Sequence, residues 1–339
     1  MQKLNVAVIG VGWFGELHIQ VYSSLPQVNL VGFFDENLQR MEDISNRYHI
    51  RAFQTIDELL ESSLIDAVSI CTGDQNHLSP VLKACRAGKH VLVEKPMART
   101  IEDCDIMIDA AQKAGIKLMP GHLLRFNNSF IVAKDRIFKG EIGSLSHIYT
   151  HRSLPKSAAH RISDWGEYHS ILFHLAVHDI DIISWLADDM IVEVYADFHS
   201  GILESEGIAL SDAVLSLLRF KRGALSLMEQ SWVHPDNYPI LVEAQTQLTG
   251  SKGKIEIDLS GRGGVSYTNN AVHHFAETYW PVIDGQTSCD LRNELDVFTK
   301  CLLAEDPLPI TMEEGRYPIC VVTAIIESLK NQKKTYVMS

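Results

Sequence analysis

Short apolar runs alternate with amphipathic segments along the first 120 residues of the chain. The runs are rich in Val, Ile and Leu, which is typical of strands that are buried on both faces of a sheet. They cover residues 5–9, 28–35, 67–72, 90–94 and 117–120. The segments that carry apolar side chains at helical spacing cover residues 12–24, 39–48, 57–61, 78–87 and 101–114. Buried strands that alternate with helices in this way predict a doubly wound parallel sheet.

The pattern changes after about residue 121, where strands begin to follow one another directly. The expected strands cover residues 145–152, 191–198, 213–220, 223–231, 240–249 and 254–259, and the expected helices cover residues 128–139, 170–186, 291–305 and 316–331. Successive strands joined by short turns predict a mostly antiparallel sheet. We therefore expect an α/β protein with an N-terminal doubly wound domain over residues 1–121 and a C-terminal α+β domain over residues 122–339. The second domain is expected to contain a large, mostly antiparallel sheet.

Composition and charge narrow the possible partners. The 339-residue chain is long enough for two domains at roughly 150 residues each. It carries 30 Lys and Arg against 43 Asp and Glu, a net charge of −13, which argues against binding to nucleic acid or an anionic membrane surface. The N-terminus enters a strand pattern at once, no apolar stretch has the length of a membrane span, and the six cysteines are scattered. We expect a cytoplasmic protein whose partners are small molecules or copies of itself.

A glycine-rich loop follows the first predicted strand. Gly10, Gly12 and Gly15 form GVGWFG directly before the first predicted helix. Gly10 suits the tight turn, Gly12 lets a pyrophosphate approach the backbone, and Gly15 lets helix and sheet pack closely. The helix N-terminus adds free N–H groups and the positive end of its dipole. Asp35 closes the second strand, where a carboxylate accepts hydrogen bonds from an adenosine ribose and repels a 2′-phosphate. The sequence predicts a Rossmann domain that binds NAD rather than NADP.

Glu94-Lys95-Pro96 follows the strand HVLVE, and with the glycine loop it resembles the Gfo/Idh/MocA family of oxidoreductases. The resemblance extends over nearly the whole chain. The other segments that carry it are Asn76-His77, AGKHVLVEKPMA at residues 87–98, GHLLRFN at 121–127, GEIGSLSHI at 140–148, VHDIDIISWL at 177–186, LTGSKGKIEID at 248–258 and EEGRYPICVVTAIIESLKN at 313–331. The resemblance implies a dehydrogenase that acts on CH–OH groups, with Lys95 and His178 as catalytic residues.

Two further sets of site residues follow from the loop, the resemblance and position in the chain. The predicted cofactor-binding residues are Gly10, Gly12, Trp13, Phe14, Gly15, Asp35, Thr72, Asn76, His77, Glu94 and Lys95. The predicted substrate-binding residues are Asp181, His174, Arg125, Asn127 and Arg152, the last three chosen by position alone.

The predicted helix over residues 170–186 carries a narrow polar stripe. At 100° per residue His174, His178 and Asp181 lie within about 60° of one another, and the other faces are apolar. A buried helix with one polar stripe lines a cavity or a partner. His178 suits a general base because the ordinary pKa of histidine is near neutrality. Lys95 can polarise the developing carbonyl, and Asp181 can orient the imidazole or bind a substrate hydroxyl.

Two positions depart from the family pattern. Many members carry Asp four residues before the catalytic histidine, where this chain has His174, and a proline is common where it has Gly73-Asp74. His174 and His178 could also bind a metal with His151 as third ligand. No acidic or thiol ligand at a telling spacing completes that set, so we expect no metal.

The expected function is hydride transfer between a nicotinamide and a secondary alcohol or ketone of a sugar, polyol or cyclitol. Two alternatives stay open. One is a dehydrogenase of a nucleotide-linked sugar, because GHLLRFN resembles a segment of some members that act on UDP-linked sugars. The other is a non-catalytic NAD-binding regulator of the same fold. The resemblance also implies a homodimer or homotetramer that forms through the C-terminal sheet.

Overall fold

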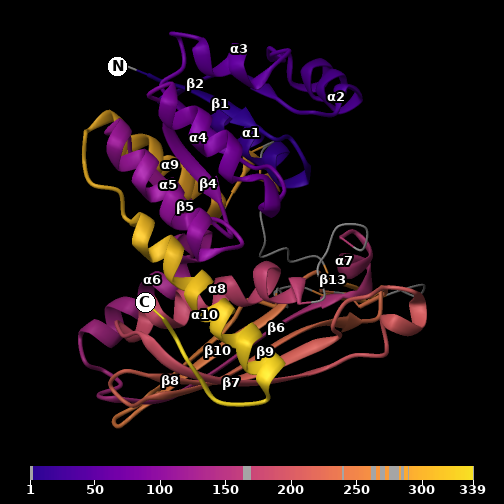
Figure 1. Ribbon diagram of the computed structural model, residues 1–339, viewed down its shortest axis with the longest axis vertical. Helices are drawn as coiled ribbons and strands as arrows, with labels where there is room; N and C mark the ends of the chain where they lie inside the picture. Colours follow the sequence, from indigo (N-terminus) through magenta and orange to yellow (C-terminus); the bar gives the residue numbers. More distant parts are fainter. Residues whose placement is uncertain are drawn as a thin grey trace. The chain divides into compact units, whose positions relative to one another are not determined.

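The computed structural model describes residues 3–162, 169–238, 240–260, 265–267, 272–274, 282–283, 286–288 and 290–338 (Figure 1). Contacts divide the chain into two compact units. The first unit comprises Met1–Phe126 and Trp280–Ile319, and the second comprises Asn127–Tyr279 and Cys320–Ser339.

The first unit is built on a five-stranded parallel sheet in the order β2-β1-β3-β4-β5. Its strands are β1 (Leu4–Ile9), β2 (Val28–Phe34), β3 (Ala67–Ile70), β4 (His90–Glu94) and β5 (Leu118–Gly121). β3 and β5 are buried along their whole length, as expected for a sheet with both faces covered. The chain adds β2 on one side of β1 and then β3, β4 and β5 on the other. The prediction of a doubly wound domain is confirmed.

Five helices lie between β1 and β5, and three of them begin at a residue whose side chain caps them. They are α1 (Trp13–Ser24), α2 (Leu38–Tyr48), α3 (Ile56–Glu61), α4 (Leu78–Arg86) and α5 (Ile101–Ala114), with 3₁₀ turns η1 (Asp74–Asn76) and η2 (Leu123–Phe126). The side chains of Asn37, Thr55 and Thr100 each accept a hydrogen bond from the backbone N–H three residues further on, which fixes the starts of α2, α3 and α5. Right-handed crossovers place α1 on one face of the sheet and α3, α4 and α5 on the other.

A helix from much later in the sequence completes the face that α1 covers. α9 (Asp290–Leu303) buries Leu291, Leu295 and Phe298 in the same core as the strands and α1. The expected boundary at residue 121 assigned this helix to the C-terminal domain, whereas the structure packs it in the first unit. The crossovers to β3, β4 and β5 all lie on one face, so the opposite face needs further apolar cover.

The second unit is built on a seven-stranded sheet in the order β11-β10-β6-β9-β8-β7-β16. Its strands are β6 (Leu145–Pro155), β7 (Ile191–His199), β8 (Ala213–Phe220), β9 (Leu225–His234), β10 (Glu243–Gly250), β11 (Lys254–Asp258) and β16 (Thr335–Tyr336). β6 and β9 pair in parallel and the other neighbours pair antiparallel. The prediction of a mostly antiparallel sheet is confirmed. In β8 buried and exposed side chains alternate from Val214 to Phe220, so one face packs inward and the other faces outward.

The remaining elements complete the second unit. They are α6 (Asn128–Phe138), α7 (Lys156–His160), a π-helical turn (Leu172–Ala176), α8 (Val177–Ala187), the 3₁₀ turn η4 (Glu204–Glu206), α10 (Met312–Asn331), and the short strands β12 (Val265–Tyr267), β13 (Val272–His274), β14 (Val282–Ile283) and β15 (Gln286–Thr287). α10 belongs partly to each unit, because the division falls after Ile319, and β14 and β15 belong to the first unit. Among the residues described, no helix has the length and apolar character needed to cross a membrane.

Candidate active site

The carboxyl ends of the parallel strands bring predicted cofactor residues to one edge of the first sheet. Asp35 follows β2, Gly10 follows β1, Thr72 lies just beyond β3 and Lys95 follows β4, so the strand order arranges them in that sequence. Neighbouring strands lie about 4.8 Å apart, which makes the row on the order of 14 Å long. The strand order reverses between β1 and β3, and doubly wound sheets bind their ligands at such a point.

The glycine loop leaves space at the N-terminus of α1. A Cβ on Gly10, which has a φ of +84°, would lie 2.7 Å from the Thr72 nitrogen, and a Cβ on Gly15 would lie 2.0 Å from the Gly10 oxygen. The close approach of α1 to the sheet therefore requires glycine at both positions. A Cβ on Gly12 would meet no atom within 4 Å. The loop thus has the open space and the helix N-terminus that a pyrophosphate requires.

The two aromatic residues of the loop differ in exposure. The Trp13 side chain is 61% exposed. Phe14 is partly buried, and its ring lies edge-on to that of His18 with 5.4 Å between centroids. Phe14 therefore contributes to packing of α1, whereas Trp13 is accessible to solvent.

Asp35 is held by the backbone on both sides. Its Oδ2 accepts a hydrogen bond from the Val11 N–H at 2.7 Å and its Oδ1 accepts one from the Asn37 N–H at 2.8 Å. Arg40, in the first turn of α2, donates Nε–H to the Val11 carbonyl. Each carboxylate oxygen has a further lone pair for a ribose hydroxyl. The fixed carboxylate fits the adenosine ribose, and the Arg40 guanidinium binds the same residue, Val11, that donates to it.

The loop after β3 is closed on itself and on the segment that follows β4. Thr72 Oγ1 donates to the carbonyl of Asn76 at 3.2 Å, and the Asn76 side chain is exposed. His77 is 1% exposed; its Nδ1 lies 2.9 Å from the Pro96 oxygen and its Nε2 lies 3.0 Å from the Thr72 oxygen. Burial lowers the pKa of His77, against the two carbonyl contacts and the charge of Asp74, which raise it. His77 therefore holds two loops together from within the protein.

Glu94 points into the interior of the first unit. It is 5% exposed; its Oε1 lies 3.1 Å from His18 Nε2, and its Oε2 accepts a hydrogen bond from the Lys95 N–H at 3.2 Å. A Cβ on Gly121 would lie 2.9 Å from Glu94 Oε1, so the glycine makes room for the carboxylate. The sequence predicts a cofactor contact for Glu94, but both of its oxygens have partners in the core. The Lys95 side chain is half-buried at the edge.

Arg125 and Asn127 lie on either side of the division between the units. The Arg125 side chain is 8% exposed, and its guanidinium lies 2.5 Å from Glu314 Oε1. Burial raises the pKa of Glu314, but the charge of Arg125 and hydrogen bonds from Thr311 hold it below its usual range. Asn127 caps α6, because its Oδ1 accepts from the Ser129 N–H at 3.0 Å. Both predicted substrate contacts thus have structural partners.

In the second unit, His174 and His178 are the two partly exposed positions of an otherwise buried segment. Every other side chain from Ile171 to Ile183 is buried, including Asp181 at 2% exposure. The two residues of this segment that solvent reaches, His174 and His178, therefore both belong to the polar stripe that the sequence predicts. His178 has the chemistry of a general base at such a point.

The segment is not the regular α-helix that the sequence predicts. Val177 N–H donates to the Leu172 carbonyl across the π-helical turn, and α8 begins at Val177. His178 and Asp181 lie three residues apart within α8, so they share a face. The extra residue of the π turn changes the direction of His174 relative to them. The His174 ring lies 6.3 Å from that of Trp232.

A buried ion pair lies beneath α8. Arg152 on β6 donates to both oxygens of Asp179, with Nη2 at 2.9 Å from Oδ1, and Gln230 on β9 donates to Oδ2 at 3.2 Å. Asp179 and Gln230 have no exposed surface, and Arg152 is 4% exposed. The sequence predicts Arg152 as a substrate contact from its position alone. In the structure its guanidinium instead pairs with Asp179, the residue after His178.

The histidine metal site considered from the sequence does not form. Arg152 points to α8, so its neighbour His151 points to the opposite face of β6 and cannot join His174 and His178. Within the described part of the chain, no group of three His, Cys, Asp or Glu side chains is arranged to bind a metal.

Sequence reasoning missed Asp179, Gln230 and His18, which hold the predicted residues in place. For Asp179 a signal was available: a carboxylate on an apolar side of a buried helix requires a buried partner. For Gln230 and His18 the sequence offers no such signal, because their partners lie far along the chain.

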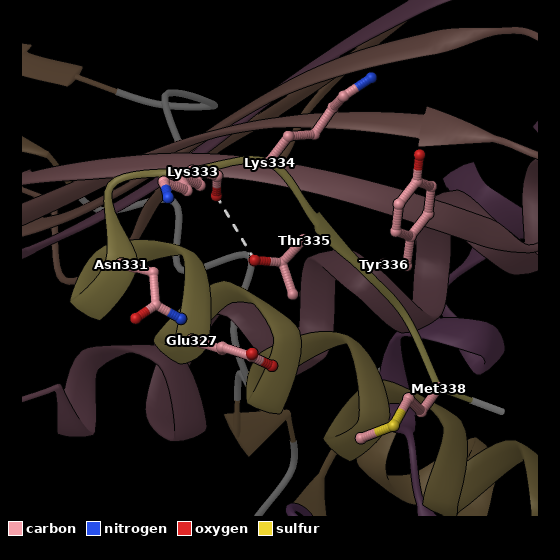
Figure 2. A pocket seen from close by; sticks show the side chains of 7 residues that line it. All are labelled: Glu327, Asn331, Lys333, Lys334, Thr335, Tyr336 and Met338. Carbon is pink, nitrogen blue, oxygen red and sulfur yellow. Dashed lines mark hydrogen bonds between the residues drawn. The ribbon is translucent and has the colours of Figure 1, made fainter.

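A shallow hollow of about 520 Å³ lies at the C-terminal end of the second unit (Figure 2). Its lining residues are Glu327, Asn331, Lys333, Lys334, Thr335, Tyr336 and Met338. Lys334 pairs with Glu193 at 2.8 Å, and Thr335 Oγ1 donates to the Lys333 carbonyl at 3.4 Å. The hollow contains none of the site residues that the sequence predicts.

Comparison with known proteins supports the resemblance that the sequence motifs suggest. Residues 4–122 match the oxidoreductase family with NAD-binding Rossmann fold, and residues 130–256 match the GFO/IDH/MocA C-terminal domain. The chain is 25% identical over 335 residues to myo-inositol 2-dehydrogenase of Thermotoga maritima, covering 97% of both chains. It is 29% identical over 278 residues to 2,7-anhydro-N-acetylneuraminate hydratase of Escherichia coli, covering 80% of this chain and 72% of that one.

A solved structure shows the same fold. Scyllo-inositol dehydrogenase from Lactobacillus casei, with bound NAD(H) and scyllo-inositol, is 19% identical and superposes with a TM-score of 0.87 over 100% of both chains. With two domains matched in order and a relative aligned along the whole chain, this protein belongs to the Gfo/Idh/MocA family of oxidoreductases.

Proposed function

We propose that this protein is an NAD-dependent dehydrogenase that transfers a hydride between nicotinamide and a secondary alcohol or ketone of a sugar, polyol or cyclitol. The observation that carries the proposal is the row Asp35, Gly10, Thr72 and Lys95 along the carboxyl edge of the first sheet. It combines a ribose carboxylate, an open phosphate loop and an ammonium in the order and over the length of a dinucleotide. The relatives named above support the substrate class.

The cofactor is proposed to be NAD rather than NADP. The Asp35 carboxylate, fixed by Val11 and Asn37, accepts hydrogen bonds from the adenosine ribose and repels a 2′-phosphate. Arg40 attracts that phosphate, but its Nε is engaged by the Val11 carbonyl. The open space beside Gly12 accommodates the pyrophosphate. Trp13 contacts the bound cofactor from the exposed side, and Asn76 and His77 support its nicotinamide end.

Lys95 and His178 carry the proton chemistry. In the oxidation direction His178 accepts the proton of the substrate hydroxyl. Lys95 donates a hydrogen bond to a substrate oxygen that becomes a carbonyl, which stabilises the negative charge that develops there. The nicotinamide, when bound, supplies the hydride acceptor for the adjacent carbon. Asp181 and His174 position the substrate. We assign Arg125, Asn127 and Arg152 to holding the site together, because each is engaged by a partner in the protein.

The outward face of the second sheet is proposed to bind another copy of the chain. Tyr149, Leu227, Leu217 and Tyr195 are directly opposite one another on β6, β9, β8 and β7. The last three are 43%, 47% and 42% exposed, respectively. A row of apolar side chains across four strands favours a self-complementary partner, as in a homodimer or homotetramer.

The compartment is proposed to be the cytoplasm. Cys85 is a buried free thiol, and such thiols persist in a reducing compartment. Cys71 and Cys301 are also free, and Cys289 lies outside the described residues.

Absorbance at 340 nm tests the activity. The native protein is mixed with NAD⁺ and a panel of myo-inositol, scyllo-inositol, aldoses, sugar acids and UDP-sugars, beside Lys95→Met and His178→Asn. We expect reduction of NAD⁺ with at least one polyol or sugar and a loss of at least about 100-fold in both variants. Turnover that survives Lys95→Met contradicts the assigned site. Turnover confined to UDP-sugars favours the nucleotide-sugar alternative.

A second arm covers chemistry without net reduction of NAD⁺. Addition of water to an anhydro sugar leaves the absorbance at 340 nm unchanged, so 2,7-anhydro-N-acetylneuraminate is followed by mass spectrometry for the hydrated product. NAD⁺ binding without turnover in either arm favours the regulator alternative.

A further inference from the structure

The loop after β3 and the segment after β4 are joined at two places. His77 contacts the Pro96 carbonyl at 2.9 Å, one residue after Lys95. Asp74 Oδ2 accepts a hydrogen bond from Arg99 Nε at 3.1 Å, four residues after Lys95. We call these two contacts the loop tie. The tie joins the carboxyl ends of two neighbouring parallel strands, and both of its contacts on the β4 side lie within four residues after Lys95.

The ion pair of the tie is almost completely shielded from water. The side chains of Arg99 and Asp74 are 10% and 7% exposed. Asp74 Oδ1 is also buried and has no hydrogen-bond partner among the described residues. The carboxylate therefore depends on Arg99 for compensation of its charge, and loss of the guanidinium leaves a buried, uncompensated anion. A shielded pair of this kind holds its geometry better than a solvated one.

The loop needs such a restraint because its own backbone supplies little. Gly73 precedes η1 with a φ of −58° and a ψ of 145°, a conformation that proline also adopts. A Cβ at Gly73 would meet only the Asn76 side chain, at 4.0 Å. Glycine does not restrict the chain to this conformation and loses much entropy when it is fixed there. The contacts of Asp74, the first residue of η1, and of His77, which directly follows it, therefore supply the restraint that a conformationally restricted residue at Gly73 would supply.

The backbone of Lys95 is held from two directions. Its own N–H donates to Glu94 Oε2 at 3.2 Å. The carbonyl of the next residue, Pro96, contacts the His77 ring, whose other nitrogen contacts Thr72. Displacement of the loop after β3 therefore displaces the segment that presents Lys95.

We propose that the loop tie makes Arg99 and His77 positioning residues, which hold Lys95 and the loop after β3 in the geometry that receives the nicotinamide end of the cofactor. This inference rests on the proposed function. Neither residue needs to touch the cofactor or the substrate. The adenosine end lies at β2 and β1, at the other end of the row, so the tie governs affinity for one half of the cofactor.

Two ligands that share the adenosine half test this inference. NADH contains both halves of the cofactor, whereas ADP-ribose lacks the nicotinamide. Binding of NADH is measured by fluorescence titration and binding of ADP-ribose by calorimetry, on the full chain. We expect Arg99→Met to weaken NADH about tenfold and to leave ADP-ribose within about twofold. Asp74→Asn, which keeps the shape of the side chain, should give a smaller loss with the same selectivity.

Restoration by proline is the second arm. If the tie restricts the backbone at Gly73, Gly73→Pro in the Arg99→Met background should recover most of the lost NADH affinity. The matched control is Arg136→Met, which breaks the exposed Arg136–Glu141 pair at 3.0 Å in the second unit and should leave both affinities unchanged.

The outcomes separate the inference from the proposed function. If Arg99→Met and Asp74→Asn each weaken the binding of NADH and of ADP-ribose equally, the loss is a general loss of structure, and the proposed positioning role of the loop tie is wrong. Unchanged NADH affinity in both variants, or no recovery with Gly73→Pro, also overturns it. A native protein that binds neither ligand overturns the proposed function, and the inference with it.

Discussion

The two sheets of the molecule are covered in different ways. The parallel sheet of the first unit has α3, α4 and α5 on one face and α1 and α9 on the other, so both of its faces are covered. The mostly antiparallel sheet of the second unit packs one face inward and presents the row Tyr149, Leu227, Leu217 and Tyr195 on the other. A sheet that is wound on both faces offers a small-molecule site. A sheet that is left open on one face offers a surface for a partner.

The largest expected effect comes from truncating a side chain of α9, the helix from late in the sequence that covers one face of the first sheet. Phe298 on α9 has no exposed surface. Phe298→Ala should lower the free energy of unfolding by about 3–5 kcal/mol, because it removes buried area and leaves a cavity. Urea denaturation followed by circular dichroism measures the change. Leu217→Ala on the open face of the second sheet is the control, with an expected cost below about 1 kcal/mol. Equal losses of unfolding free energy in the two variants would contradict the difference between the covered first sheet and the open face of the second.

The inward face of the second sheet contains a buried ion pair, so we expect a loss of stability when one of its two charges is removed. Asp179→Leu leaves Arg152 buried without its partner and should cost about 3 kcal/mol of unfolding free energy. Adding Arg152→Met removes that charge and should recover most of the loss. The same denaturation experiment tests both proteins. A double variant no more stable than the single one would show that Arg152 is not the source of the cost.

A substitution on the open face of the second sheet should change the mass of the oligomer rather than the stability of the monomer. Leu217→Arg introduces a charge in the apolar row and should shift the protein to the monomer, while the monomer changes by about 0.5 kcal/mol or less. Light scattering after size exclusion measures the mass. Leu64→Arg, at a 62% exposed leucine of the first unit, is the matched control. A native monomer, or a variant with unchanged mass, would contradict an interface at this row.

The smallest expected effect is a pH dependence that both units share. Burial lowers the pKa of His77 in the first unit and of His169 in the second below the reference value of 6.5. Between that value and the lowered pKa the unfolded chain binds more protons than the folded one. Stability should therefore fall as the pH drops below 6.5, and the loss is complete below the folded pKa. Thermal unfolding from pH 7.5 to pH 5 measures the slope, which should decrease in His77→Gln. An unchanged slope would show that His77 is not one of its sources.

What the sequence could determine is local in origin. The period of apolar positions located the strands of both sheets except the short edge strand β16, and the spacing of Gly10, Gly12 and Gly15 located the tight loop before α1. Both signals lie within a few neighbouring residues, because strand and helix periods and backbone sterics act at that range. The polar stripe of residues 170–186 was also visible, since each side chain could be compared with its neighbours on the helix.

What only the tertiary structure decided is which distant residues meet. The place of α9 in the first unit, the pairing of Arg152 with Asp179 and the engagement of Glu94 by His18 each join segments far apart in the sequence. The π turn before α8 depends on the packing around it and changes the direction of His174. A buried charge reveals that it requires a partner, but its identity depends on the path of the chain. For that reason the sequence could identify candidate site residues by their chemistry, but it could not identify the distant residues that hold them in place.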